Sequence, residues 1–226
     1  MKATLWLASE VHPSALENVP GLAGDPQFDD LCEFIRKQLE HLGYQFRWFV
    51  LNAAECGMPQ IRRQGVLFAL HEPNFALFRP PVPNVTEHVF VGSALRQSMT
   101  AGGWPDVDAW ATKAACVAPT LVGISANRDG AISGRPAPGA HGPGWEPMPF
   151  RSPTAYPTPT SSGTWVPAGP TGVVRITSPQ AAPLQGFPPD WQVIDRKTSR
   201  YRQIGHASPP PVGRALGAAS AQTLDA

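Results

Sequence analysis

The chain has 226 residues, of which 42% are hydrophobic, so it can form one domain or two small ones with a buried core. Its 18 Lys and Arg residues and 17 Asp and Glu residues give a net charge of +1, which excludes a global basic field for nucleic acid. The three cysteines are widely spaced, which argues against a disulfide framework and favours a cytoplasmic protein. No apolar run is long enough for a membrane span, and the N-terminal apolar stretch is too short and too soon interrupted by charge for a signal peptide.

The first third of the chain alternates between helical and extended patterns. Apolar residues at three- and four-residue spacing predict a helix over 28–43, which ends at Gly43. Runs of apolar residues predict strands at 46–51 and 66–70. A helix and strands joined by short links indicate part of an α/β sheet.

A change of composition follows the cluster of prolines at 80, 81 and 83. Residues 89–101 form a weak amphipathic pattern, and 120–122 read as a short strand. Residues 131–170 contain ten prolines and six glycines, which predicts irregular chain. Order is expected to return with a short helix around 180–185 and a C-terminal helix from Val212, with Leu184, Phe187 and Trp191 in the core.

Five blocks of sequence carry the chemistry. Near the N-terminus stands Glu17-Asn18-Val19, followed after the predicted helix and strand by Gly57-Met58-Pro59-Gln60-Ile61-Arg62. The last third contains three more, at 175–180 (RITSPQ), 184–191 (LQGFPPDW) and 201–211 (YRQIGHASPPP). In content and order these blocks resemble the motifs of bacterial DNA (cytosine-5) methyltransferases.

The resemblance implies the C-terminal part of a Rossmann-like α/β domain that binds S-adenosylmethionine, interrupted by a small irregular target-recognition domain. We expect residues 1–78 to belong to the catalytic domain, 79–172 to the recognition region, and 173–226 to pack back on the catalytic domain. The implied reaction is methyl transfer to C5 of a cytosine flipped out of double-stranded DNA, as in restriction-modification systems.

The same resemblance assigns residue roles. C5 methylation needs a thiolate that adds at C6 and a carboxylic group at N3, and the resemblance gives the second role to Glu17, with Asn18 beside it and Arg62 bracing the pocket. Gln60, Arg63 and Arg175 are expected to contact DNA, although Gln64 stands where the family's second arginine is usual. The expected contacts to S-adenosylmethionine come from Gln203, Gly205, His206 and Ala207, with His206 replacing the usual asparagine.

Two family motifs have no match, namely the glycine-rich cofactor loop and the Pro-Cys loop that carries the nucleophile. No cysteine follows a proline, so Cys32, Cys56 and Cys116 are not expected to be catalytic, and no histidine has metal-ligand spacing. We therefore expect the missing half to precede Met1 and the chain to be inactive alone. Two alternatives stay open: a non-catalytic recognition subunit whose partner polypeptide carries both motifs, and a DNA-binding remnant without a partner.

The segment 131–171 has two interpretations. If Ile132–Trp145 is encoded by GC-rich codons, another reading frame of the same codons can encode a stretch like the family's recognition region. This suggests that a frameshift precedes the segment and is reversed before Val173. A naturally variable, proline-rich recognition loop is the alternative, and the sequence of the gene decides between them.

Overall fold

The computed structural model describes residues 14–18, 20–83, 85–101, 103–121, 158–159, 165–166, 177–188 and 190–225. They form two compact units. The sheet unit comprises Met1–Cys56, Arg63–Asn84 and Pro211–Ala226, and the helical unit comprises Gly57–Arg62 and Val85–Pro210. The predicted boundaries at 78 and 172 stay predictions, but the observed grouping places 57–62 with the helices and the last segment with the sheet. Most of 131–171 lies outside the described residues.

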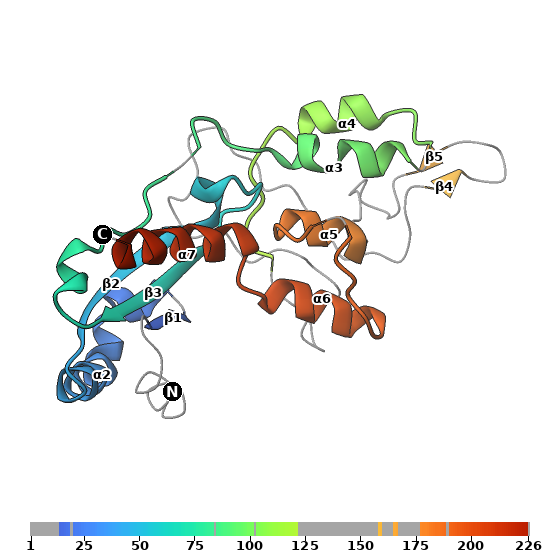
Figure 1. Cartoon of the computed structure of the whole chain (residues 1–226). Coiled ribbons are helices and arrows are strands. Elements are labelled where there is room, and N and C mark those ends of the chain that lie inside the picture. Colours follow the sequence, from blue (N-terminus) through green and yellow to red (C-terminus); the bar gives the residue numbers. More distant parts are fainter. Residues whose placement is uncertain are drawn as a thin grey trace. The chain divides into compact units, whose positions relative to one another are not determined.

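Among its described residues, the sheet unit has a sheet of three strands in the order β1, β3, β2 (Figure 1). Central β3 (Arg63–Leu70) pairs antiparallel with β1 (Ser14–Asn18) on one side and with β2 (Gln45–Asn52) on the other. The strands predicted at 46–51 and 66–70 are confirmed, and so is the mixed α/β character of the chain. The parallel pairing of a Rossmann-like sheet is not found among these three strands.

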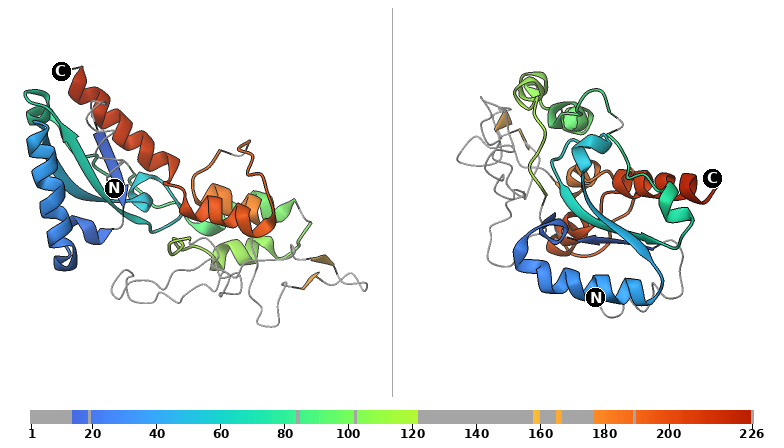
Figure 2. Two further views of the ribbon diagram at one scale, coloured as in Figure 1. Left: turned by 90° about the horizontal axis from the view of Figure 1, so that it is seen from below. Right: turned by 90° about the vertical axis from the view of Figure 1, so that its left-hand side faces the viewer.

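Both faces of β3 are covered by helices. Because successive side chains of a strand point to opposite faces, Leu67 and Phe68 belong to different clusters. Leu67 packs with α2 (Asp29–His41), whereas Phe68 lies in a cluster with Ala219 of α7 (Pro210–Leu224). Figure 2 shows α2 and α7 on the two sides of the sheet, which explains the burial of β3 from Gln64 onward.

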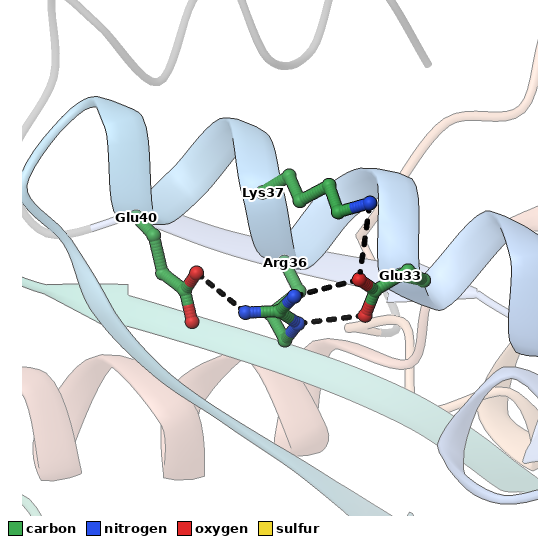
Figure 3. Close-up of polar contacts among 4 residues, drawn as sticks. All are labelled: Glu33, Arg36, Lys37 and Glu40. Atoms are coloured by element: carbon green, nitrogen blue, oxygen red, sulfur yellow. Dashed lines mark hydrogen bonds and ion pairs between the residues drawn. The ribbon is translucent and has the colours of Figure 1, made fainter.

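Helix α2 confirms the helix predicted from its periodicity. Its buried stripe includes Ile35 and Leu39, and the chain leaves the helix at Gly43, whose φ of 80° is in the left-handed region that glycine tolerates. On the exposed side, Arg36 lies between Glu33 and Glu40, and Lys37 also reaches Glu33 (Figure 3). Pairs at three- and four-residue spacing on an exposed face stabilise a helix slightly.

The described part of the helical unit contains four α-helices and one strand pair, β4 (Thr158–Pro159) and β5 (Trp165–Val166). Its core is a single cluster of mostly aliphatic and aromatic side chains. Gly92 permits the close approach of the first two helices, because a Cβ there would lie 2.1 Å from the carbonyl oxygen of Ala111. The helices are α3 (Val91–Thr100), α4 (Val107–Lys113), α5 (Ser178–Leu184) and α6 (Lys197–His206) (Figure 1).

Three expectations for this unit need comment. The amphipathic pattern at 89–101 corresponds to α3, and the short helix near 180–185 to α5. The strand expected at 120–122 is wrong for its described residues, because Ala118 forms one parallel bridge to Gln60 and the next residues bond to the loop 60–62 instead of to a strand. Trp191 was expected in the core but is 59% exposed, resting its ring on that of Phe187.

The remaining elements of the sheet unit are single turns of 3-10 helix. No helix in the described part of the chain is long and apolar enough to span a membrane. The turns are η1 (Pro20–Ala23), η2 (Pro26–Phe28), η3 (Ala53–Cys56) and η4 (Asn74–Leu77).

Candidate functional site

The predicted catalytic carboxylate lies at the end of an edge strand. Glu17 pairs with Val66 of β3, and Asn18 is the last residue of β1. Leu16 packs toward the cluster beneath α2, so the neighbouring side chain of Glu17 projects from the opposite face of the sheet, where it is exposed. The pair thus stands at the C-terminal end of β1. Val19 lies outside the described residues.

Gln60, which was expected to contact DNA, is instead completely buried in the helical unit at 0% exposure. Its Oε1 accepts a hydrogen bond from the backbone N–H of Leu121 at 2.7 Å. Its Nε2 donates to the carbonyl oxygen of Leu184 at 3.1 Å and to Oε1 of Gln185 at 2.9 Å. Because the carboxamide has no exposed surface and bonds to protein groups at both ends, we no longer assign it to DNA.

Arg62 joins two segments of the helical unit that carry different motifs. Its Nη1 donates to the carbonyl oxygen of Leu121 at 3.1 Å and to that of Gly205 at 2.9 Å. The guanidinium therefore holds residues 201–211, the closing motif, against Leu121 of the expected recognition region. A role in the cytosine pocket stays a prediction.

The residues expected to contact the cofactor lie at the C-terminal end of α6. Gln203 and His206 are exposed, and Gln203 Nε2 donates to the carbonyl of Ile194 at 3.0 Å. Gly205 is buried, and its carbonyl receives Arg62. The carbonyl of Ala207 accepts from Nε2 of Gln185 at 2.6 Å. Two backbone acceptors of this motif are thus already bonded within the protein.

Two arginines were expected on the DNA side. Arg63 is exposed at the first position of β3, and the structure assigns it to the sheet unit, whereas Gln60 and Arg62 belong to the helical unit. Arg175 lies outside the described residues. Gln64, which stands in place of the family's second arginine, is 1% exposed and cannot present its side chain to a phosphate.

No cysteine is activated as a nucleophile. Burial raises the pKa of the Cys32 thiol, with a smaller contribution from Asp29, and Cys32 Sγ donates to the carbonyl of Leu22 at 3.3 Å. Burial likewise raises the thiol pKa of Cys56, where Glu55 adds to it, and of Cys116. A thiolate nucleophile needs the opposite shift, so burial gives none of the three thiols an activating environment. That none of them is catalytic stays a prediction.

A shallow depression of about 390 Å³ lies in the sheet unit and contains none of the predicted site residues. It is bounded by α2 and by Phe46 and Trp48 of β2, with charged groups from Glu33 and Arg36 at its rim. Within the described ranges, His, Cys, Asp and Glu side chains nowhere form a group of three or more that could hold a metal ion.

The sequence reasoning missed the importance of Gln185 as a bonding partner of Gln60. Both glutamines stand among apolar residues, and a glutamine buried in such surroundings must find hydrogen-bond partners. The apolar neighbours therefore indicate that each glutamine is buried, but nothing in the sequence indicates that Gln60 and Gln185 bond to each other.

Comparisons with known proteins agree with the motifs. The sequence profile of the family "C-5 cytosine-specific DNA methylase" matches residues 9–222. The type II methyltransferase M.NgoMIV of Neisseria gonorrhoeae is 38% identical over 213 residues, which cover 93% of this chain and 65% of that protein. The type II methyltransferase M.NaeI of Lentzea aerocolonigenes is 36% identical over 89% of this chain and 47% of its own length. The chain thus spans about half to two thirds of these relatives.

Solved structures show the same fold at low sequence identity. A protein described as a prophage-encoded DNA modification methyltransferase of E. coli aligns with a TM-score of 0.58 and 17% identity, covering 98% of this chain and 73% of that one. The Dnmt2 methyltransferase of S. pombe aligns with a TM-score of 0.58 and 14% identity, covering 98% and 70%.

Proposed function

Since the chain belongs to the C-5 cytosine-specific DNA methylase family, whose methyl donor is S-adenosylmethionine, we propose that it works in methyl transfer to C5 of a cytosine in double-stranded DNA. The observation that supports this most directly is the bridge from Arg62 to Gly205, which links two of the family's motifs through one guanidinium. The Rossmann-like domain interrupted by a recognition region belongs to the same proposal.

In this proposal Glu17 interacts with N3 and the 4-amino group of the flipped cytosine, and Asn18 fixes its position. A carboxylic acid at N3 stabilises the ring after a thiolate adds at C6, which makes C5 electron-rich. Arg63 and Arg175 would contact DNA phosphates, to which a guanidinium fork is well matched.

The closing motif fits one wall of a cofactor pocket. S-adenosylmethionine supplies the methyl group as an electrophile when it is bound. Because the carbonyls of Gly205 and Ala207 are engaged by Arg62 and Gln185, the groups left to face a ligand are the exposed side chains of Gln203 and His206. Such a wall requires the glycine-rich loop opposite it, which this sequence does not contain.

We further propose that residues 1–226 transfer no methyl group by themselves and that the thiolate comes from a separate polypeptide. Raised thiol pKa values at all three cysteines support this view. The same observation favours the second candidate function, a non-catalytic recognition subunit of a split methyltransferase. We place either activity in the cytoplasm, in keeping with three free cysteines among the described residues.

The test uses radiolabelled cofactor and duplex DNA. The purified chain is incubated alone, or with a polypeptide that carries a glycine-rich cofactor loop and a Pro-Cys motif, and label in cytosine is measured. We expect label only in the mixture, and its loss when the partner's Pro-Cys cysteine is changed to serine. Label incorporated by the chain alone would show that the nucleophile lies in it, and the triple variant with serine at 32, 56 and 116 would then locate it.

A mixture that yields no label with any duplex, although both polypeptides are folded and bind each other, would favour a remnant without enzymatic function.

A further inference from the structure

A chain of hydrogen bonds inside the helical unit runs in one direction through two buried side-chain amides. The N–H of Leu121 donates to Gln60 Oε1, Gln60 Nε2 donates to Gln185 Oε1, and Gln185 Nε2 donates to the carbonyl of Ala207. Both side chains are 0% exposed, so water cannot replace any of these partners. Reversal of either amide would oppose donor to donor and acceptor to acceptor, and the direction of the chain is therefore fixed.

A second connection runs beside the first. Nη1 of Arg62 bonds to the carbonyl of Leu121 and to that of Gly205. Both backbone polar groups of Leu121 are thus held by the loop 60–62, and both connections end in the closing motif, at Gly205 and Ala207. Bonds of this kind strengthen one another where the surroundings are of low polarity.

We infer that Gln60, Gln185 and Arg62 are positioning residues that lock the end of the segment 118–121 to the closing motif 203–208, so that the two segments move as one body. Residues 118–121 belong to the region 79–172 that is expected to read DNA, and 203–207 to the motif expected to face the cofactor. The meaning of this coupling for catalysis rests on the proposed function. The coupling itself rests only on the contacts.

The consequence for the three side chains is specific. Arg62 bonds to both segments directly, whereas Gln60 and Gln185 act through each other, so loss of either glutamine disturbs a segment to which it is not itself hydrogen-bonded. Gln185 is hydrogen-bonded to Gln60 and to Ala207, and through the first of these bonds it orients the amide of Gln60 that holds Leu121. If Gln185 had only a local structural role, its substitution would not disturb residues 118–121.

The experiment measures hydrogen–deuterium exchange of the full-length chain, without DNA or cofactor, in Gln185→Leu and Gln60→Leu. We expect the protection factors of peptides covering 118–121 and 203–208 to fall together by at least tenfold in both variants. The helices α3 and α4 report whether the unit is still folded. Gln180→Leu is the matched control, because Gln180 is also buried on α5 at 1% exposure but bonds to Ser98 and Met99.

A pH series of Gln60→Glu provides a variant that differs little in shape. A buried carboxyl group ionises at higher pH than usual, and its acid form can donate one hydrogen bond to Leu184 or Gln185. Protection at both segments should be close to wild type at low pH and fall as the introduced carboxyl ionises.

Three results would overturn the inference. These are unchanged protection at 118–121 in Gln185→Leu, the same pattern of loss in Gln180→Leu, or equal protection of Gln60→Glu at all pH values. Since exchange needs no activity, failure of methyl transfer leaves this result standing, and unchanged exchange leaves the proposed function untouched.

Discussion

Gln60 and Gln185 stand 125 residues apart in the chain and share a hydrogen bond of 2.9 Å between fully buried side chains. A carboxamide is costly to bury unless its donors and acceptors are satisfied, and here each amide satisfies the other while reaching a backbone group beyond. The pair therefore specifies that the loop 60–62 lies against the C-terminal ends of α5 and α6 in the helical unit, which apolar packing alone would not specify.

Truncation of Gln185 should destabilise the helical unit. Gln185→Ala leaves the carbonyl of Ala207 without this donor and Gln60 without one acceptor, and an unsatisfied buried polar group costs about 1–3 kcal/mol. Urea unfolding measures the loss. Gln203→Ala removes an exposed amide from the same region and should change stability by less than about 0.5 kcal/mol. Equal losses of unfolding free energy in Gln185→Ala and Gln203→Ala would show that burial of the Gln185 amide does not determine its contribution to stability.

Gly92 is predicted to tolerate no side chain. A Cβ at this position would lie 2.1 Å from the carbonyl oxygen and 3.0 Å from Cα of Ala111, and backbone atoms of α4 cannot turn away as a flexible side chain can. Gly92→Ala should therefore separate α3 from α4 and cost at least about 1–3 kcal/mol. Thermal unfolding followed by circular dichroism measures it.

The control for this prediction is Gly217→Ala, since a Cβ at Gly217 on α7 would meet nothing within 4 Å. In a helix interior that change should stabilise by roughly 0.5–1 kcal/mol. A Gly92→Ala protein as stable as wild type would show that the two helices do not pack as closely as described.

Glu33 should titrate at unusually low pH. Hydrogen bonding to Arg36, with a smaller contribution from Lys37, lowers the pKa of its carboxyl from 4.5 to about 2. Its stabilising effect is thus complete above pH 4.5 and is lost as the pH falls from there toward 2. The effect on folding is small, because the group is exposed and salt screens the pairs. Carbon-detected NMR titration gives the midpoint, which Arg36→Gln should raise toward the ordinary value.

The sequence predicted much of the secondary structure because local periodicity is strong in it. The stripe of Ile35 and Leu39 defines α2, and the runs that include Phe46 and Leu67 define β2 and β3. Helix α6 was not predicted because, among its described side chains, only those of Tyr201 and Ile204 are large and buried, which is too few to set a period.

The candidate site was harder to predict for another reason. The motif order identified the family, which the comparisons confirm, but a motif does not tell which of its side chains face inward. Gln60 was expected at DNA and is buried, where its amide bonds to the backbone N–H of Leu121 and the carbonyl of Leu184. Such partners are distant in sequence and become visible only when the chain is folded.

The three thiols should react slowly at neutral pH. Because burial raises the pKa of Cys32, Cys56 and Cys116, the thiolate fraction at pH 7 is lower than in a free peptide. Iodoacetamide labelling with mass spectrometry should give rates below that of a cysteine peptide at each site, rising as the pH approaches the raised pKa. Rapid labelling of any one in the folded chain would identify an activated thiol and reopen the question of the nucleophile.

Glu17→Gln provides the sharpest test of the proposed catalytic carboxyl. The substitution preserves the backbone pairing of Glu17 with Val66 and replaces an exposed side chain, so the stability of the sheet unit should stay within about 0.5 kcal/mol of wild type. In the mixture with the partner polypeptide, methyl transfer should nevertheless fall by about 10²–10⁴-fold, because an amide cannot supply the acid at N3. Glu87→Gln, which neutralises another exposed carboxylate, should leave the rate unchanged. A Glu17→Gln chain that supports full transfer would remove this carboxyl from the reaction, and an unfolded one would assign it to the sheet edge instead.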